Sequence, residues 1–177
     1  VLLLFVILIL AFAYTAIVHY SYSFEQHAFP KAFFVSLILL ALSSVVLQKA
    51  FKAYRQEDES QLFKVLFLTL LLSFLFLAAQ MYGWKELVET GIFFRGIPVG
   101  SYFYLLTGLH ALHLVGGIVF LAIFTWQVRR LAYDAVKKLV YFTNPYELLK
   151  LQMLSYYWHA MGILWGILFV IFLVIFL

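Results

Sequence analysis

The sequence predicts an all-α integral membrane protein, built as one domain over residues 1–177 with five transmembrane helices. Composition indicates this class, because 66% of the 177 residues are hydrophobic and 11% are charged, with a mean hydropathy of +1.03. Soluble domains of this size do not show such values. The apolar residues also gather in five runs, each close to the ~20 residues that cross a bilayer. The runs cover residues 2–18, 32–49, 62–82, 101–127 and 153–177.

Polar segments separate the first three runs. The run at 2–18 is interpreted as a span and not as a cleavable signal peptide, because no small-residue cleavage site follows it. Within the second run lie the polar side chains of Ser43, Ser44 and Gln48, for which hydrogen bonds between helices are favoured over a proton path. A solvated acidic turn at residues 57–59 then leads into the third run.

The fourth and fifth runs follow two longer polar segments. Glycines and a proline mark residues 83–100 as a loop on the outer surface, and a basic segment precedes the fifth run. None of the eight acidic residues lies inside a run, and the sequence contains no cysteine. Disulfides, iron–sulfur clusters and thiolate metal sites are therefore excluded.

The basic residues predict the orientation. Nine of the twelve lie between runs two and three or between runs four and five, and basic residues hold loops on the cytoplasmic side. This distribution places the N-terminus in the cytoplasm and the C-terminus in the periplasm. It also accounts for the net charge of +4 without a nucleic-acid partner. The nine are Lys49, Lys52, Arg55, Lys64, Arg129, Arg130, Lys137, Lys138 and Lys150.

Polar and small residues form stripes on the last two runs. Residues three or four apart share a helix face, and Thr107, His110, His113 and Gly117 are spaced in this way. In the last run His159 shares a face with a G-x-x-x-G pair. Such stripes favour close contact between helices in lipid. The predicted helix-packing residues are Gly108, Gly117, Trp158, His159, Gly162 and Gly166.

The three histidines in these runs raise the alternative of a metal or haem site. His110 and His113 lie one turn apart on one helix and cannot reach opposite sides of the same haem. Zinc and di-iron sites normally add carboxylates, which the runs lack. His159 lies roughly 9 Å from the cytoplasmic end of its run and His113 ~20 Å from that of its own. We therefore predict no catalytic, cofactor or metal residue here, and favour neutral imidazoles bonded between helices or to lipid headgroups over the functional alternative.

Two elements of the sequence resemble a known family. TGLHALHLVGG at residues 107–117 and YYWHAMGILWGILFVIFL at residues 156–173 look like the two closing helices of subunit III of haem–copper cytochrome c oxidases. FFVSLILLALSSVVLQKAFKAYRQED at residues 33–58 and LLLSFLFLAAQMYGW at residues 70–84 resemble the second and third helices of the short, five-span bacterial form. The elements G-x-H-x-x-H and W-H at this separation carry the resemblance.

The resemblance implies a non-catalytic subunit of a proton-translocating oxidase in a bacterial inner membrane. In that family the haems and copper belong to subunits I and II. Subunit III packs on subunit I, holds phospholipid between two helix groups, and keeps turnover and proton uptake steady. The expected partners are therefore subunits I and II and phospholipid, and membership of a larger respiratory assembly is left open.

Two departures from the family pattern narrow this expectation. The family usually has an acidic residue a few positions after the W-H element, where this chain has Gly162, and commonly a glutamate in an early helix, which the first run lacks. The roles still expected of this chain are scaffolding, lipid binding and stabilisation of the complex. The predicted lipid contacts are His110, His113, Trp84, Arg129 and Arg130, because imidazoles and basic residues can meet headgroup oxygens. Membrane anchoring is the alternative role of the arginines and Trp84.

Two other functions are weighed against this one. Related subunits accompany quinol oxidases and nitric oxide reductases, and this sequence does not choose between electron donors. A small transporter or haem-binding membrane protein that uses His110, His113 and His159 is a third alternative. The sparse polarity of the runs disfavours it, since transporters usually contain interrupted helices or buried charges.

Overall fold

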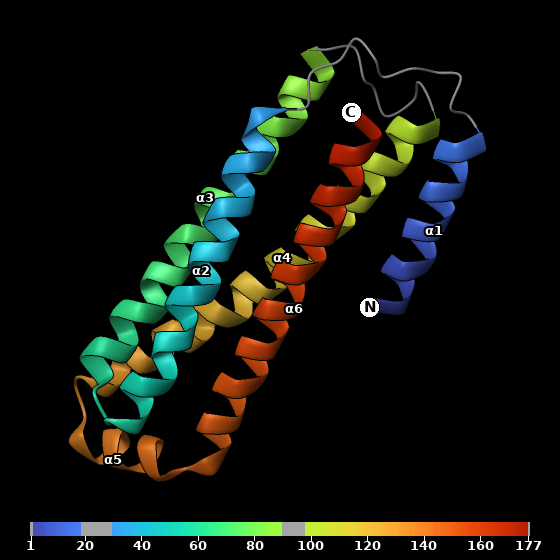
Figure 1. Cartoon of the computed structure of the whole chain (residues 1–177). Helices are drawn as coiled ribbons and strands as arrows, with labels where there is room; N and C mark the ends of the chain where they lie inside the picture. The colour runs from blue at the N-terminus through green and yellow to red at the C-terminus, as the bar shows by residue number, and fades with distance from the viewer. Residues whose placement is uncertain (1, 19–29, 90–97, 177) are drawn as a thin grey trace.

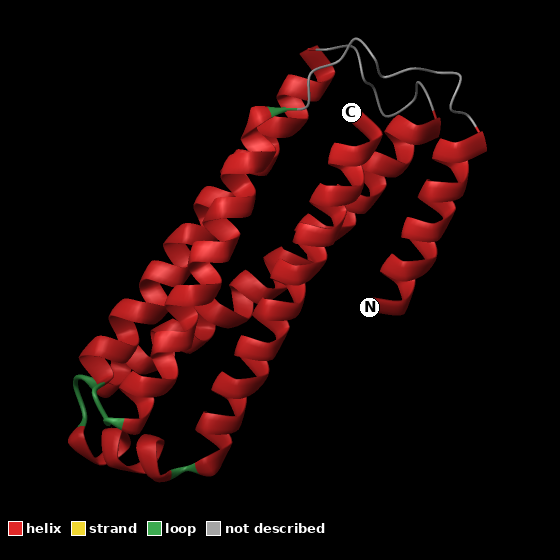
Figure 2. Ribbon diagram, in the orientation of Figure 1, coloured by secondary structure: helices red, strands yellow, loops and turns green. Residues whose placement is uncertain are grey.

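The computed structural model describes residues 2–18, 30–89 and 98–176, and all of the secondary structure in these residues is helical (Figure 2). Four helices are long and apolar enough to cross a membrane: α2 (Lys31–Arg55), α3 (Glu59–Glu89), α4 (Pro98–Leu131) and α6 (Pro145–Phe176). A shorter apolar helix of 17 residues, α1 (Leu2–Val18), comes first. The all-helical membrane class and four of the five predicted spans are thus confirmed, and α1 as a fifth span stays a prediction.

The long helices extend beyond the predicted spans. Helix α2 ends at Arg55 instead of residue 49, α3 continues to Glu89, and α6 begins at Pro145 instead of residue 153. Hydropathy marks the length that lies in lipid, whereas Lys, Glu, Gln and Arg are good helix formers that continue the same helix outside it. The loop predicted at 83–100 is therefore wrong over 83–89 and 98–100, which are helical, and 90–97 lies outside the described residues.

A short helix, α5 (Ala135–Thr143), was not predicted at all. It begins at Asp134, whose Oδ1 accepts hydrogen bonds from the backbone N–H groups of Val136 and Lys137, both at 3.1 Å. This is a typical N-cap, which satisfies donors that the first helical turn leaves free. A length criterion for membrane spans cannot detect a helix of nine residues.

Two helix groups make up the bundle (Figure 1). Helices α2 and α3 form an antiparallel hairpin, joined by a tight turn in which Glu57 adopts a positive φ of 54°. Helices α4 and α6 form the second group, α1 packs on α4 along part of its length, and α5 closes one end. That end also carries the α2–α3 turn and the first turn of α6. We call it the basic end, because most of the lysines and arginines gather there.

The core that joins the two groups is aromatic. Phe33 of α2 lies between α3, α4 and α6, with ring centroids 5.7 Å from Phe103 and 5.9 Å from Trp165. On α3 it meets Gly83, where a Cβ would come within 2.8 Å of the Phe33 ring. A single buried phenylalanine thus contacts all four long helices, and glycine is required opposite it.

Buried hydrogen bonds fix the register between helices. Gln80 Nε2 donates to Ser36 Oγ at 2.8 Å between α3 and α2, and Trp158 Nε1 donates to Ser43 Oγ at 3.0 Å between α6 and α2. Polar groups inside a membrane bundle must find partners on neighbouring helices. These bonds therefore set how far each helix slides along the next.

Candidate functional site

His110, the first histidine of the sequence motif, is enclosed in the core. Its side chain is 0% exposed and its ring stacks on Trp165, with centroids 5.2 Å apart and planes 21° apart. Phe76 and Phe5 contact it edge-on, at 6.1 and 6.5 Å between centroids. Neither ring nitrogen has a hydrogen-bond partner in the described part of the chain. His110 therefore packs as an aromatic ring between α1, α3, α4 and α6.

His113 lies at the contact of α4 with α1 and α6. Its Nδ1 lies 2.7 Å from the carbonyl oxygen of Leu109, so that nitrogen carries the proton and donates. Tyr157 of α6 donates through its hydroxyl to the His113 carbonyl oxygen at 2.6 Å. Phe5 packs against the imidazole edge, with centroids 5.6 Å apart. The half-buried ring thus belongs to an interhelical contact near the surface.

Trp84 joins α3 to α4. Its Nε1 donates to the hydroxyl of Thr107 at 3.1 Å, and Thr107 in turn donates to the carbonyl oxygen of Phe103 at 2.9 Å. The indole is half-buried, so one part of it faces outward while its N–H is used inside the bundle. Thr107, which the stripe pattern singled out, therefore meets the third helix.

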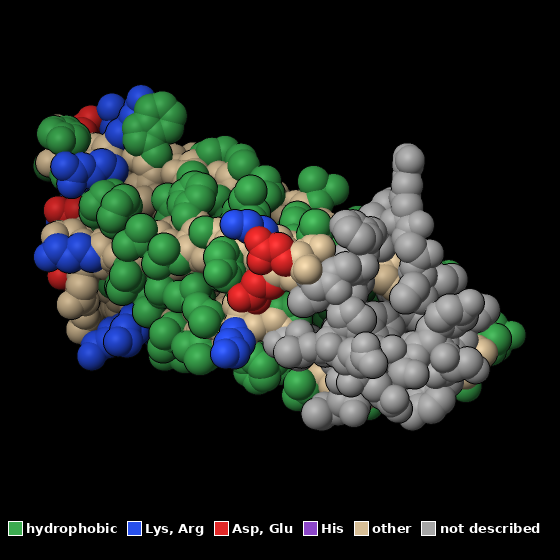
Figure 3. Space-filling view, turned by 90° about the horizontal axis from the view of Figure 1, so that it is seen from above, with side chains coloured by type: hydrophobic (Ala, Val, Ile, Leu, Met, Phe, Trp, Pro, Cys, Tyr) green, Lys and Arg blue, Asp and Glu red, His purple; other side chains and the backbone are tan. Residues whose placement is uncertain are grey.

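Arg129 and Arg130 lie exposed at the basic end. The Arg129 guanidinium lies 5.0 Å from the centre of the Phe63 ring, and that of Arg130 lies 4.2 Å from the Trp126 ring. Such cation–π contacts hold the charge at the surface and leave its hydrogen-bond donors free for an anion. Figure 3 shows lysines and arginines gathered at this end, whereas hydrophobic side chains cover the middle of the same face.

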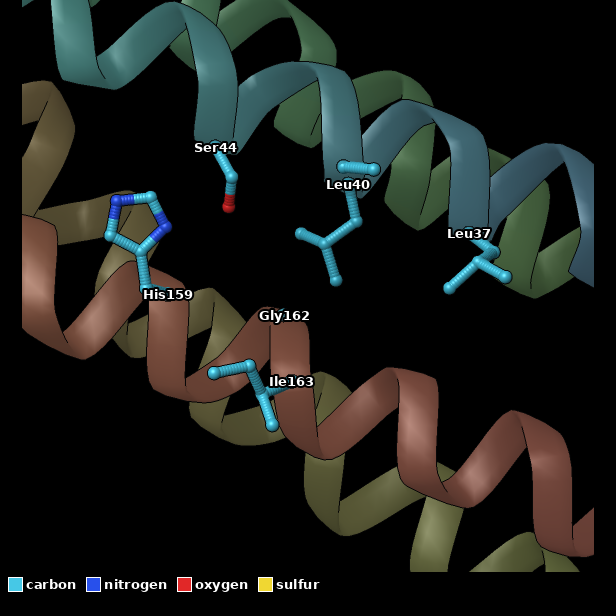
Figure 4. Close-up of a pocket in the computed structure, with 7 residues that line it drawn as sticks. Leu37, Leu40, Ser44, His159, Gly162 and Ile163 are labelled. Atoms are coloured by element: carbon cyan, nitrogen blue, oxygen red, sulfur yellow. The ribbon is translucent and has the colours of Figure 1, made fainter.

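A groove opens between α2 and α6. It has a volume of about 360 Å³ and its lining is apolar except for Ser44 and His159. Both of these side chains point into the space between the two helices (Figure 4). Gly162 forms part of the wall of α6, and the other lining residues are Leu37, Leu40, Ala41 and Ile163. The lining suits a hydrocarbon chain, with the two polar side chains, Ser44 and His159, together at one end of the groove (Figure 4).

The predicted packing glycines differ in their surroundings. A Cβ at Gly117 would come within 2.8 Å of Tyr157 Cε1, whereas one at Gly162 would meet Ser44 Oγ at 3.5 Å. At Gly108 and Gly166 a Cβ would meet no atom within 4 Å. Trp158 is fully buried beside Gly117, and the following residue, His159, faces the groove. Among these four glycines, the tightest contact with a neighbouring helix therefore lies at Gly117.

The described residues include no group of three or more His, Asp or Glu side chains that could hold a metal ion. His110 and His159 also face different surroundings, the aromatic core and the α2–α6 groove. Sequence reasoning missed the buried Ser36–Gln80 bond and the surroundings of Tyr141. The spacing of Ser36, Leu40, Ser43 and Leu47 places them on one helix face and could have indicated the Ser36–Gln80 bond. The surroundings of Tyr141 depend on α5, which was not predicted.

The sequence is similar to proteins of one known family. The sequence model of a family described as "Cytochrome c oxidase subunit III" matches residues 3–176. A "Probable cytochrome c oxidase subunit 3" of Nocardia farcinica is 35% identical over 134 residues, which is 74% of this chain and 59% of the relative. The subunit 3 of Corynebacterium diphtheriae is 28% identical over 80% of this chain and 63% of its own length. That of Synechocystis sp. is 29% identical over 77% and 54%. The chain thus spans about three fifths of the length of these relatives.

Proposed function

Because the chain belongs to the cytochrome c oxidase subunit III family, we propose that it acts as the non-catalytic subunit III of a haem–copper cytochrome c oxidase. It is a multi-pass membrane protein of a bacterial cytoplasmic membrane. In this proposal its partners are subunits I and II, which hold the haems and copper, and this chain packs on subunit I. The match over residues 3–176, which includes both histidine elements, carries the proposal.

The proposed topology is one domain with five spans, an N-terminus in the cytoplasm and a C-terminus in the periplasm. The basic end supports it, since nine of the twelve lysines and arginines belong to the helix ends and turns on that side. A common aromatic core between the two helix groups supports one domain, because α2, α3, α4 and α6 all contribute to it.

Phospholipid is the proposed ligand. The α2–α6 groove accepts an acyl chain, and Arg129 and Arg130 offer free donors to a headgroup phosphate at the basic end. His113 and Trp84 are proposed as contacts through the parts of their rings that face outward. His110 is fully buried among aromatic rings, so we propose that it affects lipid binding only indirectly, through the packing of the helices. Lipid held in this way, with the interhelical bonds, steadies turnover and proton uptake in the partner subunits.

Purification of the tagged natural protein in mild detergent tests this function. We expect a-type haem and two larger subunits to co-purify, and we expect the chain separated from them to be colourless. Haem retained by the separated chain would overturn the proposal and make His110, His113 and His159 the residues to study. Co-purification without a copper-binding subunit II would instead favour a quinol oxidase or nitric oxide reductase as the partner.

A further inference from the structure

The α2–α6 groove contains two polar side chains that a hydrocarbon chain alone leaves unused. Ser44 of α2 and His159 of α6 point into the groove, together at one end (Figure 4). Both are half-buried, so a molecule in the groove can reach them. A Cβ at Gly162, one turn after His159, would lie 3.5 Å from Ser44 Oγ, which places the hydroxyl at that level of α6. The two polar groups therefore face one occupant from opposite walls.

Neither polar side chain has a hydrogen-bond partner in the part of the chain that the structure describes. A serine in a helix often donates to the carbonyl oxygen four residues earlier, but the Leu40 carbonyl oxygen already accepts from Ser43 at 2.7 Å. A polar group in contact with hydrocarbon costs free energy unless it finds a partner. The groove therefore presents two free donors to its occupant.

The depth of these groups limits what the partner can be. Ser44 lies five residues before Lys49, ~7.5 Å along α2, and His159 lies roughly 9 Å into the last apolar run. Each leaflet of the hydrocarbon core is only ~15 Å thick. The phosphate and ester groups of a phospholipid stay at the surface of this layer, because burying them is costly. An acyl chain reaches the two donors but offers them no acceptor.

A neutral ring with two carbonyl oxygens suits this position. Carbonyl oxygens accept hydrogen bonds without carrying a charge, so they can lie within the hydrocarbon layer once they are bonded. The Ser44 hydroxyl donates one hydrogen bond, and the His159 imidazole has at least one ring N–H to donate. Oxygens on opposite sides of a flat ring can accept from both walls of the groove. The chemistry of the site therefore matches a quinone.

The rest of the groove suits a hydrocarbon tail. Leu37, Leu40 and Ala41 form the apolar wall on α2, and Ile163 stands opposite on α6. The volume of about 360 Å³ lies at the lower end of the range for small-molecule sites, about 300–1,000 Å³, so it holds a ring and the start of a tail. Ile163 is 66% exposed, so the groove is open on that side and a longer tail continues into the lipid.

We propose that the α2–α6 groove binds an isoprenoid quinone, with its carbonyl oxygens on the Ser44 hydroxyl and the His159 imidazole and its tail along Leu40 and Leu37. The quinone competes there with the acyl chain of the proposed function. The inference rests on the position of α2 and α6 in a membrane, and it holds whichever partner subunits the chain has.

Photolabelling of the natural complex tests this site. The probe is a decylbenzoquinone that carries an aryl azide, and mass spectrometry of the digested chain locates the attached label. We expect label on α2 and α6 around Ser44 and His159, and unlabelled decylbenzoquinone should compete it away. Decylbenzene has the same tail and no carbonyl oxygen, so it should compete at least roughly tenfold less well. No label on these segments, or equal competition by decylbenzene, would overturn the proposal.

Two variants remove one donor each. Ser44→Ala and His159→Phe should each weaken competition by decylbenzoquinone by roughly threefold to tenfold, the equivalent of one hydrogen bond. Competition by decylbenzene should stay the same, which separates a lost hydrogen bond from altered packing. Tyr156→Phe is the matched control, because it removes a hydroxyl from α6 outside the groove lining, where Tyr156 is 76% exposed. If Ser44→Ala and His159→Phe behave like this control, the two donors do not bind a quinone.

The position of the label separates this inference from the proposed function. A quinone site in a partner subunit would place the label on that subunit, so only labelled peptides of this chain support the groove. Phospholipid retained in the groove with no quinone label on α2 or α6 would overturn the quinone and keep the groove as a lipid site. Neither result changes the haem and subunits that co-purify, which test the proposed function.

Discussion

Trp158 of α6 donates a hydrogen bond through its indole Nε1 to the hydroxyl oxygen of Ser43 on α2, at 3.0 Å. Both side chains are fully buried, and the Ser43 hydroxyl in turn donates a hydrogen bond to the carbonyl oxygen of Leu40 at 2.7 Å. The bond joins the two helix groups of the bundle. The two residues of the W-H element therefore face different surroundings: Trp158 lies in the core, and His159 faces the α2–α6 groove.

Removal of this bond should weaken the bundle measurably. In a double-mutant cycle of Trp158→Phe and Ser43→Ala, we expect a coupling free energy of ~0.6 kcal/mol, the average for hydrogen bonds between membrane helices. Each single variant also changes packing, and the cycle removes that contribution. Thermal or denaturant unfolding of the protein in detergent supplies the four values. A coupling of zero would show that the two groups are not bonded.

Gly117→Ala should destabilise the contact of α4 with α6. The new Cβ would lie within 2.8 Å of the Tyr157 ring, whose hydroxyl donates to the His113 carbonyl oxygen, so the ring can yield only by losing that bond. We expect a loss of about 1–3 kcal/mol, as for overpacked cores. Gly108→Ala on the same helix is the control, since its Cβ would meet nothing within 4 Å. Unfolding curves that rank the two variants in the opposite order would contradict this packing.

His110→Phe should leave the protein folded and the haem content of the natural complex unchanged. Phenylalanine keeps the ring contacts with Trp165 and Phe76, and it removes two nitrogens that have no partner in the described chain. The loss of unfolding free energy should stay within about 1–3 kcal/mol, because the phenyl ring is larger than imidazole and slightly overpacks the enclosed site. The reduced-minus-oxidised spectrum checks the haem. A lost haem band would indicate that His110 is a ligand.

Gly162→Leu should displace lipid from the groove between α2 and α6 without unfolding the bundle. The larger side chain enters a space of about 360 Å³ whose wall Gly162 forms. Native mass spectrometry should then count fewer tightly bound phospholipids than in the unchanged protein. Gly166→Leu, one turn along α6 and outside the groove lining, is the matched control. If both variants retain the same lipids, the groove is not the binding place.

The Asp134 cap should make the stability of α5 depend on pH. The backbone N–H of Lys137 and then its side chain hold the pKa of the Asp134 carboxyl below its ordinary value. A lowered folded-state pKa contributes stability above the ordinary carboxyl pKa, and this contribution is lost as pH falls through the folded-state value. The protection of the α5 amides against hydrogen exchange should therefore fall in acid more than it does in Asp134→Asn, which keeps a cap without a charge. The same acid response in the asparagine variant would assign it to another group.

Several features of this protein could be predicted from the sequence, because they depend on local composition. An apolar run of membrane length must form a helix in lipid, whatever its neighbours are, so the all-helical membrane class and four long spans followed directly. The histidine elements at residues 107–117 and 156–173 indicated the family, which the match over residues 3–176 confirms. The predicted spans are shorter than the helices, which begin before them or end after them, because hydropathy falls at the lipid boundary while the helix continues.

The tertiary structure decided which side chains meet. His110 and His113 lie one turn apart on the same helix, yet the first is enclosed against Trp165 and the second lies half-buried beside Tyr157. Their positions on α4 are local, but their surroundings come from α1, α3 and α6, which approach from far along the chain. The groove of Ser44 and His159 likewise exists because α2 and α6 lie side by side. The pattern of residues along one helix does not show which other helix packs on it, so these contacts could be identified only in the assembled bundle.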